Sequence, residues 1–183
     1  MARAEVYLQI EISKLRHECP DGRWFICPKE LSVLLTEERI GEVVRESNVP
    51  VIQHPDVTEL IFKEAKMLLG ILIWVGASHD VLKFIERGEL DKQLPLEVNR
   101  VAEIEPSIAA AFLECQWSFI PPIFRKEMSG YHCRFREQEI LPIIGKQSLG
   151  AGSVGVVDKV EILPTAQTIF PDAVCSVSTD WQQ

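Results

Sequence analysis

The sequence has little positive charge for its length. Its 183 residues include 19 lysines and arginines against 27 aspartates and glutamates, a formal net charge of −8. Non-specific binding to nucleic acid needs a basic surface that displaces counterions from phosphates, so we expect no nucleic-acid partner. Hydrophobic residues make up 46% of the chain, which excludes a wholly disordered protein and predicts one globular unit or two small ones.

Long hydrophobic runs are also missing. The most apolar stretch covers residues 67–77, about half of the ~20 residues that a membrane-spanning helix needs. The first residues lack the basic and apolar segments of a secretory signal. We therefore expect no membrane association and a location in the cytoplasm, with the nucleus as an alternative.

Cysteine is scarce and odd in number. The five cysteines are Cys19, Cys27, Cys115, Cys133 and Cys175. Their wide spacing predicts free thiols in a reducing compartment. His17, Cys19 and Cys27 match no common zinc spacing and lack a fourth ligand, so we expect no metal site. His132 and Cys133 are adjacent and would face opposite sides of a strand, so we expect no catalytic residues there or elsewhere.

Helical periodicity dominates the first two thirds of the chain. Apolar residues recur at helical spacing in four stretches: 28–48, 56–72, 78–88 and 106–117. Asp56 and Ser78 are predicted N-caps, Gly88 a C-terminal stop, and the 56–72 helix the central buried one. Residues 1–18 fit either a strand or a helix.

The last third favours strands. Tyr131, Cys133 and Phe135 alternate with polar residues, and a β-branched run follows the glycines near residue 150. The predicted fold class is α+β, with a mainly helical N-terminal domain followed by a β-hairpin. The expected divisions are a helical domain over 1–125, a β region over 126–172 and a loosely ordered tail over 173–183.

The sharpest motif is a glycine triplet. It reads Gly150-Ala151-Gly152-Ser153-Val154-Gly155-Val156-Val157. Glycines at this spacing let main-chain amides approach phosphate oxygens without a Cβ in the way. A dinucleotide fold would continue into a helix, whereas the β-branched residues here favour a second strand. Strand, glycine turn and strand is the arrangement of the loop that covers phosphates in protein kinases. The alternative is a β-hairpin turn whose glycines only allow the backbone conformation of the turn and bind no ligand.

Several stretches together carry a family resemblance. They are residues 24–28, 34–36, 114–122, 139–142 and the glycine loop, and the most distinctive is Gln116-Trp117-x-Phe119-x-x-Pro122. From about residue 24 to 172 the chain resembles the N-terminal part of filamentous-fungal kinase-like proteins, in which a helical region precedes a Ser/Thr-kinase-type domain. The resemblance implies a hairpin that begins a kinase N-lobe and weak binding of ATP. The implied nucleotide-binding residues are Gly150, Ala151, Gly152, Ser153, Val154, Gly155 and Val157, the last packing on the adenine base.

Groups that the kinase pattern requires are missing from these residues. The segment Ala173-Val174-Cys175 has a cysteine where the pattern places the third-strand lysine, and no lysine follows Lys159. The catalytic-loop Asp and the metal-binding Asp-Phe-Gly have no counterpart, so Mg²⁺ is expected only with a complete kinase domain. We therefore predict a truncated, pseudokinase-like protein that does not transfer phosphate alone. The alternative is a non-catalytic module whose helical domain binds a protein partner.

Overall fold

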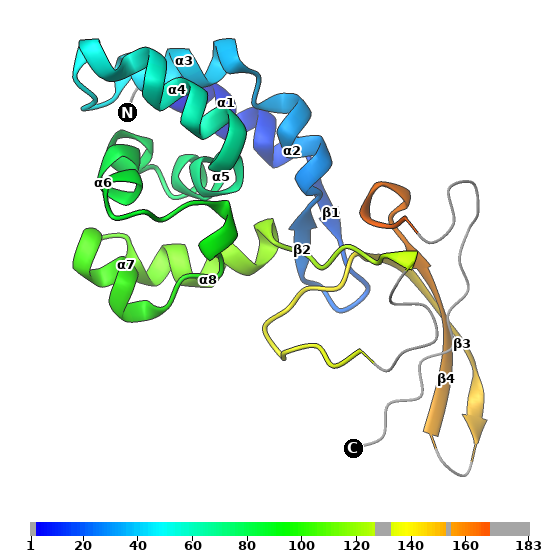
Figure 1. Ribbon diagram of the computed structural model, residues 1–183. Helices are drawn as coiled ribbons and strands as arrows, with labels where there is room; N and C mark the ends of the chain where they lie inside the picture. The colour runs from blue at the N-terminus through cyan, green and yellow to red at the C-terminus, as the bar shows by residue number, and fades with distance from the viewer. Residues whose placement is uncertain (1–2, 127–132, 153–154, 169–183) are drawn as a thin grey trace.

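A helical body and a long β-hairpin make up the computed structural model, which describes residues 3–126, 133–152 and 155–168. Figure 1 shows the helices gathered at one end and the hairpin projecting from them. The protein is thus a mixed α+β chain that is mostly helical, as the sequence predicts.

Eight α-helices lie within the described ranges. They are α1 (Arg3–Lys14), α2 (Pro28–Leu34), α3 (Glu37–Glu46), α4 (His54–Glu64), α5 (Lys66–Trp74), α6 (Val81–Glu86), α7 (Val98–Ile104) and α8 (Ala109–Phe119). Short 3₁₀ turns are η1 (Val51–Gln53), η2 (Ser78–Asp80), η3 (Asp91–Gln93) and η5 (Pro164–Ala166). Two antiparallel hairpins pair β1 (Arg16–Glu18) with β2 (Trp24–Ile26), and β3 (Ile143–Gly152) with β4 (Gly155–Ile162).

The ambiguous N-terminal segment is helical. In α1 the residues Ala4, Leu8 and Ile12 are buried at helical spacing, so the helical alternative is correct for residues 3–14. The apparent strand alternation of Val6 and Ile10 leaves both side chains on the exposed side of the helix.

Two predicted helices each divide into two. The 28–48 stretch breaks at Leu35 and Thr36, where the Thr36 side chain accepts a hydrogen bond from the Arg39 N–H and starts α3. The 56–72 stretch breaks at Ala65, whose φ of −141° and ψ of 28° are not helical. Neither break is marked by a proline or a glycine.

The predicted caps are only partly right. Asp56 lies in the first turn of α4 and does not cap it, since the helix begins at His54. Ser78 begins η2 instead of capping α6, and its N–H donates to the Glu5 carboxylate. Gly88 does end its helix, with a φ of +77° that favours glycine.

The other corrections concern α7, α8 and the segment after residue 130. The sequence did not predict α7 as a helix, and α8 begins at Ala109, later than the predicted Pro106. Cys133 and Phe135 lie outside any strand, so the alternation predicted there is wrong at both positions, and Tyr131 lies outside the described residues.

The main core surrounds α5. Residues 68–73 of this helix are buried on every side, against α1, α2 and α8. The prediction of a central buried helix is thus right for the later part of the 56–72 stretch, whereas α4 buries only Val57, Thr58 and Ile61. A second, smaller core joins the base of the β3–β4 hairpin to the β1–β2 hairpin. Its buried members are Cys19, Phe25, Cys27, Ile140, Leu163 and Ala166.

Candidate functional site

The glycine motif lies at the tip of the β3–β4 hairpin. The ladder pairs Gly150 with Val157 and Gly152 with Gly155, so strand, turn and strand follow one another as predicted. Ser153 and Val154 lie outside the described residues. The structure therefore brings the described members of the predicted site together at the end of the hairpin.

Gly150 has the backbone conformation that calls for glycine. Its φ is +142°, and a Cβ added to it would meet nothing within 4 Å. The hairpin shifts register between Ser148 and Gly150, which indicates a bulge just before the tip. The neighbouring Leu149 is 63% exposed, so this end of the hairpin is open to a ligand.

The two faces of β4 have opposite environments. Asp158, Val160 and Ile162 are buried, whereas Lys159 and Glu161 on the other face are exposed and Val157 is half-buried. Because side chains alternate along a strand, Val157 shares the outward face with the two exposed residues. The residue that the resemblance assigns to adenine thus points away from the helical body.

A cleft of about 370 Å³ lies on the inward face, between the β1–β2 turn and the hairpin. Its walls include Cys19, Pro20, Asp21, Arg23, Leu141, Ile143, Lys146, Asp158 and Val160. Lys146 Nζ lies 2.8 Å from Asp158 Oδ2, and Arg23 Nε lies 2.8 Å from Asp21 Oδ2. Both cations are therefore neutralised by a neighbouring carboxylate within the cleft.

The sequence did not single out Lys146 and Asp158, because counting back from the glycine turn along both strands places Lys146 opposite Glu161. The bulge between Ser148 and Gly150 shifts the register by one residue, so Lys146 lies opposite Val160, on the face of Asp158. The pair and the cleft lie on the face opposite Val157. The cleft is consequently a separate feature from the predicted nucleotide site.

The thiols near these sites are not activated. Burial, reinforced by the charge of Asp21, raises the pKa of Cys19 to about 11, and burial raises that of Cys115 to about 12. Both thiols stay protonated near neutral pH, and a protonated thiol is a poor nucleophile. Of the cysteines within the described residues, Cys19, Cys27 and Cys115 are buried, Cys133 is exposed, and all four are free.

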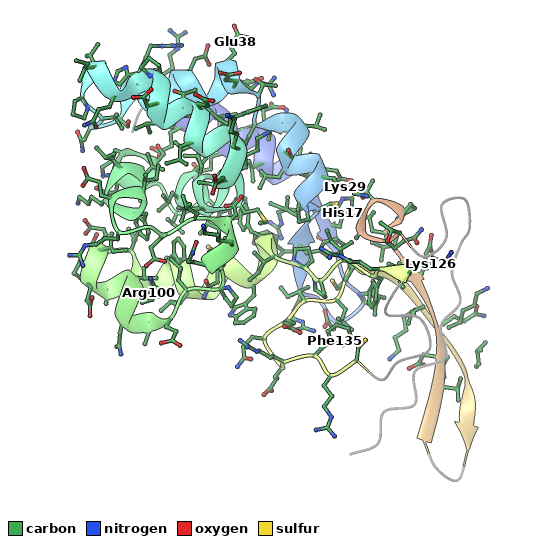
Figure 2. The ribbon with its side chains drawn as sticks, in the orientation of Figure 1. His17, Lys29, Glu38, Arg100, Lys126 and Phe135 are labelled. Atoms are coloured by element: carbon green, nitrogen blue, oxygen red, sulfur yellow. The ribbon has the colours of Figure 1, made fainter. Side chains whose placement is uncertain are left out.

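A polar junction ties the hairpin to the helices. His17 Nε2 lies 2.7 Å from Glu30 Oε2, and the Thr165 hydroxyl donates to Glu30 Oε1 at 3.2 Å. Figure 2 shows His17 where β1 and α2 meet the η5 loop. The carboxylate separates the hydroxyl from the imidazole, so the cluster lacks the contact between nucleophile and base that catalysis requires.

No metal centre is formed by the part of the chain that the structure describes. Its histidine, cysteine, aspartate and glutamate side chains make no group of three or more that could hold an ion. His17, Cys19 and Cys27 belong instead to the junction and to the second core. The same described residues contain no helix long and apolar enough to cross a membrane.

The distinctive Gln116-Trp117-x-Phe119 stretch has structural roles. The Gln116 side chain accepts from the Leu96 N–H at 2.8 Å and donates to the Leu96 carbonyl at 3.1 Å. Phe119 is fully buried in the main core, and Trp117 packs on the second core. The stretch therefore connects the two cores and contributes no reactive group to a site.

Comparison with protein-family models, with curated proteins and with solved structures gives no match to the chain.

Proposed function

We propose that the chain is a protein-kinase-like protein whose β3–β4 hairpin binds the phosphates of ATP through the glycine loop at 150–157. The observation that carries the proposal is the hairpin itself, which pairs Gly152 with Gly155 and presents Gly150 at a positive φ. Loops of this composition bind phosphate through main-chain amides, because glycine places no Cβ between the amide and the oxygens.

The outward face of β4 supplies the second part of the argument. Val157 lies on that face and is half-buried, so its side chain is available to an apolar ring. The purine of ATP would pack there while its phosphates lie along the glycine loop. One hairpin provides only one wall of such a site, so the proposed affinity is weak.

Phosphoryl transfer is not part of the proposed activity of these residues. The sequence has no lysine after Lys159 and no Asp-Phe-Gly, so it lacks the groups that hold Mg²⁺ and orient the transferred phosphate in kinases. Magnesium would arrive bound to the nucleotide, and a protein site for it belongs to a complete kinase domain.

Titration calorimetry with MgATP tests the proposal. Gly152→Val should weaken binding about tenfold or more, because a β-branched side chain blocks the approach of phosphate to the backbone. The control is Gly22→Ala, which changes a glycine in the β1–β2 turn, outside the glycine loop. If the wild-type chain and Gly152→Val bind MgATP with equal affinity, or if the wild-type chain does not bind ATP at millimolar concentration, the proposal that the loop binds phosphate is refuted.

The helical part supports a second candidate function, binding of a protein partner. Val51 and Ile52 are adjacent in η1 and are 80% and 88% exposed, so they present apolar side chains that a protein partner would cover. A photo-crosslinking residue at position 52 should capture one reproducible partner that a residue at Lys92 does not. Direct binding of that purified partner should then fail with Ile52→Lys, and unchanged binding would refute this candidate.

A further inference from the structure

β4 has one edge that pairs with no other strand among the described residues. Its ladder joins it to β3 alone, in a two-stranded sheet. An unpaired edge presents main-chain N–H and C=O groups that can bind another extended segment. Figure 1 shows most of the hairpin projecting beyond the helices.

We propose that this edge binds β4 of a second copy of the chain. The two strands run antiparallel about a two-fold axis through Val160, and Lys159 of each copy faces Glu161 of the other. The result is a symmetric dimer with a continuous four-stranded sheet, β3–β4–β4–β3, across both subunits.

The charges of β4 select this register. In an antiparallel pair, opposed residues must lie on the same face, so each two-fold register has one residue on the axis. Axes through Asp158, Lys159 or Glu161 would set identical charges against each other. The axis through Val160 instead opposes valine to valine and creates two Lys159–Glu161 pairs.

Lys159 and Glu161 also have no ion-pair partner among the residues that the structure describes, whereas the other charge on this strand has one. Both side chains are exposed, and the residues opposite them on β3 are Gln147 and Gly145, which carry no charge. Asp158 by contrast has its partner, Lys146, at 2.8 Å within the same hairpin. The free charges therefore lie where a second β4 would neutralise them.

The expected dimer is weak. The register overlaps only the segment from Asp158 to Ile162, an interface well below the ~1,200 Å² of stable complexes. Sedimentation equilibrium of the full chain should show the average mass rising from 20.7 kDa toward twice that value as the protein concentration reaches hundreds of micromolar.

Charge reversal tests the register. Lys159→Glu or Glu161→Lys alone places like charges at both pairs and should raise the dimer dissociation constant about tenfold. The double variant restores both pairs and should dimerise as the wild type does. A mixture of the two single variants should form a heterodimer, because each then supplies the charge that the other lacks.

The control is Lys92→Glu, which reverses an exposed lysine on η3 and should leave dimerisation unchanged. Both tested side chains are exposed, so the variants should keep the circular dichroism spectrum of the wild type. A monomer at every concentration, or dimerisation that single reversals do not weaken and the double variant does not restore, would overturn the proposal. Neither outcome bears on the binding of ATP at the hairpin tip.

Discussion

The Gln116 side chain makes both of its backbone hydrogen bonds to one residue, Leu96, in the segment before α7. The side chain is buried, so no water replaces a lost bond. Gln116→Leu should lower the free energy of unfolding by about 2–4 kcal/mol, because it leaves the buried N–H and C=O of Leu96 without hydrogen-bond partners. Urea denaturation measures the loss.

The matched control is Glu114→Gln on the exposed side of the same helix, which should change stability by less than about 0.5 kcal/mol. A Gln116→Leu protein as stable as the wild type would show that the two bonds add nothing to the fold.

Lys83 joins two acidic residues from different parts of the helical body. Its Nζ lies 2.7 Å from Glu105 Oε2 and 2.9 Å from Asp80 Oδ1. The ammonium group, helped by Ser107, lowers the pKa of Glu105 from 4.5 to about 2. The stabilisation that this pair provides is therefore present above about pH 4.5 and is lost as the pH falls toward 2.

Glu105→Gln should reduce the acid sensitivity of the protein. Comparing urea midpoints at about pH 7 and about pH 3, we expect a smaller drop in the variant than in the wild type, because part of the proton-linked stability has been removed. The group is close to the surface, so the effect should shrink in high salt. An identical drop in both proteins would contradict the role of the pair.

At the scale of elements, the glycines of α3 and α5 differ in the space around them. A Cβ on Gly70 would lie 2.9 Å from Leu31 Cδ2 and 3.3 Å from Phe119 Cε1, whereas a Cβ on Gly41 would meet its nearest atom, on Arg45, at 3.4 Å. Leu31 and Phe119 are fully buried, so they have little room to move.

Gly41→Ala and Gly70→Ala should therefore have opposite effects. We expect Gly41→Ala to raise the free energy of unfolding by about 0.5–1 kcal/mol, because alanine lowers the conformational entropy of the unfolded chain. Gly70→Ala should lower the free energy of unfolding by about 1–2 kcal/mol, because the added methyl group overpacks the core. Thermal and urea denaturation of the two variants measure both values. A stabilised Gly70→Ala protein would mean that α2 shifts to make room.

Local signals in the sequence predicted elements better than their ends. Gly88 ends its helix in a conformation that glycine prefers, and the glycines and β-branched residues near 150 form a hairpin, so the sequence predicts both features. The sequence does not predict the break at Ala65, because Asp91 caps the start of α5: its carboxylate accepts from the Met67 and Leu68 N–H groups. No local pattern reveals a cap supplied from a distant turn.

The candidate site follows the same rule. Residue types alone predict the order of strand, glycine turn and strand, and the register at Gly150 and Gly152 agrees with that order. The cleft beside Asp158 could not be predicted from the sequence, because it forms only when the β1–β2 turn, over a hundred positions earlier, lies against the hairpin. Cys133 and Phe135 show the converse error, since alternation without a pairing partner does not make a strand.

At the scale of the whole molecule, several described contacts hold the base of the hairpin. They are the second core around Phe25 and Leu163, the Glu30 carboxylate, and the backbone hydrogen bonds that Phe124 makes with Ala166 and Thr168. Leu163→Ala should release the hairpin by opening a cavity in that core. Hydrogen exchange followed by mass spectrometry should show lost protection in β3 and β4 while α5 keeps its protection.

Leu149→Ala provides the control for that variant, because Leu149 is on the same hairpin but 63% exposed. It should leave exchange in β3 and β4 unchanged. Loss of protection in α5 together with β3 and β4 would show instead that helices and hairpin unfold as one cooperative unit.

The buried carboxylate of Glu5 has a consequence for synthesis on the ribosome. It accepts the Ser78 N–H at 2.8 Å, and α1 packs on α5. Helix α1 therefore cannot complete its contacts until the segment through Ser78 has also emerged from the exit tunnel. During that interval Leu8 and Ile12 stay uncovered in the nascent chain, a condition under which chaperones bind and translation speed affects yield.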